Sequence, residues 1–104
     1  MTDVQKRQYE MGYTAAEFSR VLQGNFSGEK SPFKCSALSP ESWQITQHDT
    51  DVDIHIEIEN KPARVLGAIT LPVLQVTFEM LQASPQQTIN FFDKFFKYFH
   101  KGGG

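Results

Sequence analysis

Residues 84–99 read SPQQTINFFDKFFKYF and contain five of the nine phenylalanines in the chain. On a helix, which advances about 100° per residue, the aromatic residues of this stretch fall on one half of the surface and its charged residues on the other half. Ser84 and Gln87 are spaced as a capping box, and Pro85 stands at the first helical position, where a missing amide hydrogen costs nothing. The stretch therefore predicts a long amphipathic helix.

The apolar arc of this helix is wider than one sheet should cover. It spans about 180°, whereas ordinary packing on a core needs a stripe of about 100°. Phe91, Phe95 and Tyr98 lie at the flank of the arc. Because aromatic residues are enriched at the buried centres of protein interfaces, these three residues are the interface candidates.

Alternation of apolar and polar residues marks the strands. It is strictest over residues 51–59, where four aliphatic residues alternate with acidic residues and one histidine, and it recurs over residues 74–80. Weaker alternation marks further strands at residues 8–13, 33–37 and 42–46. The apolar face of such a sheet needs a cover, and the aromatic helix is the largest cover available.

Turn-forming residues divide the segment between the two strictest strands. Residues 60–62, Asn-Lys-Pro, favour a turn, and β-branched residues over 64–69 favour a strand after it. Pro72 cannot donate a ladder hydrogen bond and indicates a second turn or bulge. Residues 51–80 are therefore expected to form a meander of three strands.

A shorter helix is expected near the N-terminus. It begins after Thr14, which forms a capping box with Glu17. Phe18 and Leu22 lie about one turn apart and give its inward face, and Gly24 offers a left-handed end.

The sequence thus predicts an α+β fold, because its helices are segregated from a run of strands. We expect an antiparallel β-sheet of four to five strands in the order β-α-β-β-β-β-α, with the aromatic C-terminal helix packed across one face. The chain of 104 residues has the length of one domain. Residues 1–7, a polar lead, and residues 102–104, a glycine tail, are expected to be flexible.

Charge and composition argue against several classes of partner. Ten Lys and Arg residues against twelve Asp and Glu residues give a net charge of −2, and the basic residues are scattered, so we expect no nucleic acid as partner. No apolar run approaches the roughly 18 residues that span a membrane, and residues 1–10 lack the apolar core of a secretory signal. The single cysteine, Cys35, fits a reducing compartment. We therefore expect a cytoplasmic protein without membrane attachment and without a cofactor.

Asp53, His55 and Glu57 project from one face of the strictest strand. Carboxylate and imidazole groups can hold zinc or another divalent metal, and alternate strand residues can converge on one ion. The same three residue types are also typical of the solvated face of an antiparallel strand. We take the solvated face as the interpretation and a metal site as the weaker alternative.

The motifs of common enzyme classes are missing from the sequence. It contains no glycine-rich phosphate loop, no Gly-x-Ser-x-Gly elbow and no His-Glu-x-x-His helix. Cys35 has no local signature of a nucleophile and is interpreted as a small core residue. We therefore assign no catalytic residue and favour a protein that is not an enzyme, with an enzyme kept as the alternative.

Two partial resemblances suggest other functions. The end Gly102–Gly104 resembles the glycine tails of ubiquitin-like and sulfur-carrier proteins, but those tails leave a β-grasp strand and this one leaves a helix. The order of elements resembles a reduced helix-grip arrangement, in which a curved sheet and a last helix enclose apolar ligands. Here we expect the bulky aromatic residues to fill such a space.

Two functions from different classes follow. The preferred hypothesis is a small non-catalytic module for protein interaction or self-association, as a homodimer, through the flank of the aromatic helix. The alternative is a domain that binds a small apolar ligand, or an enzyme, with a pocket between the last helix and the sheet. Trp43, Phe78 and Phe95 are the pocket candidates.

Overall fold

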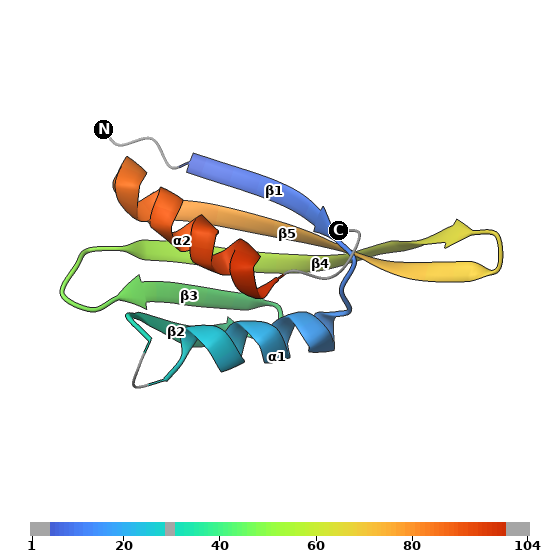
Figure 1. The fold of residues 1–104 in the computed structure, drawn as a ribbon, viewed down its shortest axis with the longest axis horizontal. Coiled ribbons are helices and arrows are strands. Elements are labelled where there is room, and N and C mark those ends of the chain that lie inside the picture. The colour runs from blue at the N-terminus through green and yellow to red at the C-terminus, as the bar shows by residue number, and fades with distance from the viewer. Residues whose placement is uncertain (1–4, 29–30, 100–104) are drawn as a thin grey trace.

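The computed structural model describes residues 5–28 and 31–99. Five antiparallel strands form one sheet, and two helices lie on the same face of it (Figure 1). The elements in chain order are β1 (Gln5–Met11), α1 (Ala15–Phe26), β2 (Phe33–Ser39), β3 (Ser42–Gln47), β4 (Asp53–Leu66), β5 (Ile69–Gln82) and α2 (Pro85–Tyr98). The α+β class, the order of the elements and the aromatic C-terminal helix are confirmed.

The strands lie in the order β1-β5-β4-β3-β2, so the first two strands of the chain form opposite edges of the sheet. Helix α1 connects these two strands in the chain and lies on the helix-covered face, alongside β2 (Figure 1). Strand β1 begins at Gln5, so three residues of the expected flexible lead belong to the sheet. Residues 1–4 and 102–104 lie outside the described residues.

Helix α1 begins as predicted and ends later. Thr14 and Glu17 form both hydrogen bonds of the capping box, at 3.0 and 3.1 Å. The helix passes through Gly24 and ends at Phe26, whose ring lies 5.7 Å from that of Phe33 and 5.5 Å from that of Phe91. Burial of Phe26 against two other elements explains why the helix does not stop at the glycine.

Helix α2 covers the sheet. The reciprocal hydrogen bonds between Ser84 and Gln87 fix its first turn, at 2.8 and 3.1 Å. Phe95 packs on β5 with its ring centroid 4.9 Å from that of Phe78. Phe95 and Phe99, one turn apart on the helix, stack at 4.3 Å. The core is therefore built largely from aromatic rings.

The meander of three strands predicted for residues 51–80 is wrong. This segment lies in a single hairpin of two strands, β4 and β5, which have 14 residues each. Pro62 and Pro72 lie inside these strands at a register shift between Lys61 and Arg64. A bulge leaves residues out of the ladder, so proline is tolerated there without ending the strand. The turn is at Gly67, which has φ of 63° at the first central position of a two-residue turn, where glycine is needed.

The hairpin is longer than its neighbours. Strand β1 ends opposite Leu74 and β3 begins opposite Glu57, so the end of the hairpin has no neighbouring strand among the described residues. We call residues 60–73 the arm. It projects from the sheet along the longest dimension of the molecule, which is 49 Å (Figure 1).

The sheet face away from the helices is polar. Side chains on this face form hydrogen bonds between neighbouring strands, for example from Gln8 to Thr77 at 3.4 Å and from Gln44 to Asp53 at 2.9 Å. The molecule therefore has two layers, with one covered and one open sheet face.

Candidate functional site

The interface candidates predicted on α2 separate into buried and exposed residues. Phe91 and Phe95 are fully buried, whereas Tyr98 is 38% exposed. The ring of Phe91 lies 5.5 Å from Phe26 of α1 and 5.8 Å from Phe33 of β2. Helix α1 thus covers one flank of the wide apolar arc, so the arc is occupied by the protein's own residues at Phe91 and Phe95.

The pocket candidates Trp43, Phe78 and Phe95 are all buried. Phe95 packs on Phe78 at 4.9 Å, and Trp43 packs on Phe18 of α1 at 5.6 Å. Their rings occupy the space between the helices and the sheet. The indole Nε1 of Trp43 is buried without a hydrogen-bond partner among the described residues.

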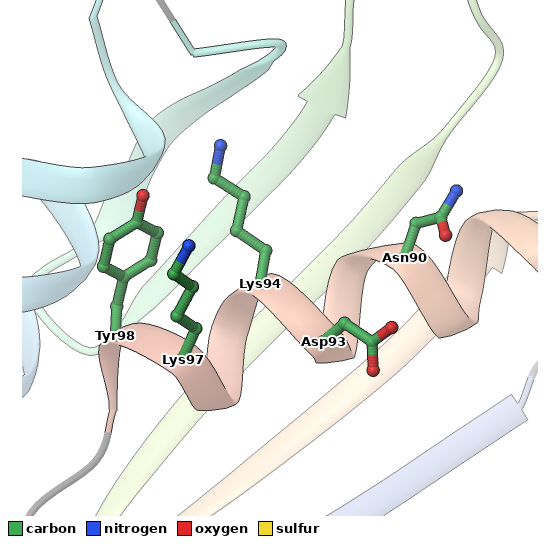
Figure 2. A pocket seen from close by; sticks show the side chains of 5 residues that line it. All are labelled: Asn90, Asp93, Lys94, Lys97 and Tyr98. Atoms are coloured by element: carbon green, nitrogen blue, oxygen red, sulfur yellow. The ribbon is translucent and has the colours of Figure 1, made fainter.

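A hollow of about 300 Å³ lies on the outer surface of α2 (Figure 2). It is lined by Asn90, Asp93, Lys94, Lys97 and Tyr98. The ammonium group of Lys94 lies 5.7 Å from the ring of Phe33 and 5.9 Å from that of Tyr98. All five lining residues come from one helix, so the hollow has one wall and offers no enclosure for chemistry.

The weaker metal alternative, Asp53, His55 and Glu57, lies on the open sheet face. Asp53 accepts a hydrogen bond from Gln44, and His55 stands between Gln44 and Glu79 of the neighbouring strands. Among residues 5–28 and 31–99, no group of three or more His, Cys, Asp or Glu side chains is arranged to hold a metal ion.

Cys35 lies half-buried on the helix side of β2. Burial raises the pKa of its thiol to about 11, against a smaller lowering effect of the hydrogen bond with Ser27. A thiol with this pKa is protonated at neutral pH, and the thiolate is the reactive form. Cys35 is therefore a poor nucleophile in this structure.

The arm carries an exposed apolar surface that the sequence analysis did not identify. Val65, Leu66, Ile69 and Leu71 are between 42% and 65% exposed. Leu66 pairs with Ile69, and Arg64 pairs with Leu71 two residues further along each strand. Paired residues and alternate residues share a face of a hairpin, so these four residues lie on the same face. Three aliphatic side chains thus lie on one face of the arm, and Val65 lies on the other.

The two basic residues of the arm form ion pairs. Lys61 pairs with Glu59 on its own strand. Arg64 reaches Glu10 on β1, with 3.6 Å between the guanidinium and the carboxylate. Both basic residues of the arm therefore have acidic partners, and the free end of the arm is aliphatic.

The sequence contained a signal for this surface. Residues 64–71, RVLGAITL, do not alternate between apolar and polar. Except for Arg64 and Thr70, every residue of this segment is apolar or small. A strand with one solvated face should alternate, so the loss of alternation indicated either burial on both faces or exposure of apolar residues. The structure distinguishes these two possibilities. Strands β4 and β5 extend beyond the strands beside them, so the apolar residues of this segment are exposed.

Comparisons with models of known protein families, with curated proteins and with solved structures gave no match to this chain. Within the described residues, neither helix has the length and apolar character required to cross a bilayer.

Proposed function

We propose that this protein is a non-catalytic protein-interaction module that inserts the end of the arm into an apolar cleft of another protein. The observation that carries the proposal is the exposure of Val65, Leu66, Ile69 and Leu71 on a projecting hairpin. Fully burying one such side chain stabilises a protein by about 1.5–3 kcal/mol. Because each of these side chains is about half exposed, a partner that covers it can gain roughly half of that free energy. Exposed aliphatic clusters of this kind mark interaction sites.

Recognition through side chains is supported by the arrangement of the strand edges. Pro62 and Pro72 lack the amide hydrogen that an added strand would need, and the register shift interrupts the ladder beside them. Pairing of the arm with another strand is therefore disfavoured. The aliphatic side chains on its faces remain the available contact.

A protein cleft suits this surface better than an anionic lipid surface. Lys61 and Arg64 are already paired with Glu59 and Glu10, and the chain carries a net charge of −2. Attraction to anionic headgroups depends on unpaired basic residues near the surface. The remaining driving force is burial of apolar area.

The proposal extends to the compartment. The lone thiol of Cys35 is half-buried and fits a cell compartment in which disulfides do not form. We assign the module to the cytoplasm on this ground.

Site-specific photo-cross-linking in the cells that make the protein tests the function. A photo-reactive phenylalanine analogue replaces Ile69 at the end of the arm, and the matched control replaces Ser36, an exposed polar residue of β2. We expect one discrete protein adduct from the arm position and none of that identity from the control. With the partner purified, Leu66→Ser with Leu71→Ser should weaken binding at least about tenfold, because two buried aliphatic contacts are lost.

The fold should not change in this double variant, since both positions are exposed, and the melting temperature is the check. The same adducts from the arm and control positions, or unchanged affinity of a folded double variant, would contradict the proposal.

A further inference from the structure

The two edges of the sheet differ in how they are protected. At the β2 edge the register shifts between Ala37 and Ser39, and a proline stands immediately before and immediately after the strand. The hydroxyl of Ser27 donates a hydrogen bond to the Cys35 carbonyl of this strand, at 3.4 Å. Bulges, prolines and covering segments keep an edge from pairing with another chain.

The β1 edge is regular over its whole described length. All seven residues of β1 pair with β5 in unbroken register, from Gln5 opposite Met80 to Met11 opposite Leu74. The strand contains no proline and is the outermost strand on its side of the described sheet (Figure 1). No strand formed by residues 5–28 and 31–99 pairs with its outward N–H and C=O groups, so this edge can accept another strand.

The charges of β1 are complementary to themselves in the antiparallel direction. A two-fold axis at Gln8 places Lys6 of each copy opposite Glu10 of the other. It also places Arg7 opposite Tyr9, a cation next to an aromatic ring. Opposite charges on directly opposed residues are favourable, and like charges there are unfavourable. A shift of the axis by one residue in either direction would lose two residues of the described overlap, and the shift to Arg7 would also put Arg7 opposite Arg7.

The helix side of this edge offers apolar contact. Ile89 and Phe96 of α2 are 53% and 39% exposed. The ring of Phe96 lies 5.2 Å from that of Tyr9, and the guanidinium of Arg7 lies 4.6 Å from the ring of Phe92, so this side of α2 stands over β1. A strand added at β1 would bring its own helix-side residues beneath these two side chains.

We propose that a second copy of this chain occupies the β1 edge, so that two five-stranded sheets join into one antiparallel sheet of ten strands. The α2 helices of both copies then lie on the same face. The reciprocal match of Lys6 with Glu10 identifies the occupant as the same strand in another copy. Glu10 also pairs with Arg64 of the arm, but the proposed function rests on the aliphatic residues of the arm, so the two proposals stand or fall independently.

Charge reversal with mass measurement tests the interface in the full chain. The wild-type protein should show twice the monomer mass of 11.8 kDa in light scattering or sedimentation. A dilution series measures the dissociation constant of the dimer. Lys6→Glu places two carboxylates opposite each other at both symmetric positions, and Glu10→Lys places two ammonium groups there. Each single variant should raise the dissociation constant at least about tenfold.

Mixing the two single variants is the decisive experiment. A heterodimer of the Lys6→Glu and Glu10→Lys chains has opposite charges at both positions, so the mixture should recover the wild-type affinity. Leu66→Ser on the arm is the matched control and should leave the mass unchanged. Lys6 and Glu10 are exposed, and circular dichroism verifies that the variants fold.

A monomeric wild-type protein throughout the dilution series would overturn the proposal and leave the edge to another occupant. An unchanged dissociation constant in both single variants would also overturn the proposal. So would a mixture of the two single variants that forms no heterodimer.

Discussion

Truncation of Phe95 should remove a large part of the stability of this domain. The side chain is fully buried, and its ring lies 4.9 Å from Phe78 on the sheet and 4.3 Å from Phe99. Replacing a buried phenylalanine by alanine costs about 3–5 kcal/mol, against a typical total of about 5–15 kcal/mol for a folded domain. In a domain of this length the melting temperature should fall by at least about 12 °C.

Phe96→Ala is the matched control for this experiment. Phe96 is the next residue on the same helix and is 39% exposed. Both substitutions gain the same few tenths of a kcal/mol in helix propensity, so the difference between them isolates burial. We expect Phe96→Ala to cost about 1–2 kcal/mol.

Urea denaturation followed by the fluorescence of the single tryptophan measures both variants. Trp43 is buried against Phe18, at 5.6 Å between ring centroids, so unfolding exposes it to water. Titrations at two protein concentrations separate folding from self-association. Equal losses for the two variants, or a loss below about 1.5 kcal/mol for Phe95→Ala, would refute the placement of α2 over the sheet.

Three further predictions concern the backbone and the thiol. Gly24→Ala should stabilise the protein by about 0.5–1 kcal/mol in thermal denaturation, because Gly24 lies inside α1 with open space around its Cα. Gly67→Ala should destabilise it by about 1 kcal/mol in the same assay, since φ there is 63°, and hydrogen exchange should show faster opening confined to the arm. Cys35 should make stability fall as pH rises from 9 through about 11, because the unfolded chain releases the thiol proton first, and Cys35→Ser should make this fall smaller in pH-dependent denaturation.

Local chemistry explains what could be predicted of the fold. The capping boxes at Thr14 and Ser84 depend on residues three positions apart, and the alternation over residues 51–59 depends on neighbours along one strand. These signals carry no information about which elements meet. The position of α1 beside α2, which buries Phe91, depends on the route of the chain between opposite edges of the sheet.

The candidate site was predictable only in part. The apolar arc of the last helix was visible in the sequence, but its buried and exposed members could not be told apart without α1. Because proline ends most strands, the sequence predicts turns at Pro62 and Pro72, whereas a bulge accommodates them here. Turns at these positions place the aliphatic residues of the arm in a short strand of a meander, so the sequence pattern does not reveal the arm.

The pairing of β1 with β5 has a consequence for synthesis of the chain. Gln5 lies opposite Met80, so β1 leaves the ribosome well before β5, the strand that it pairs with. Contacts of such long separation are slow to form, because a large loop must close first. The β4–β5 hairpin closes through a two-residue turn and can fold as soon as it has been translated. Strand β1 remains unpaired until that point.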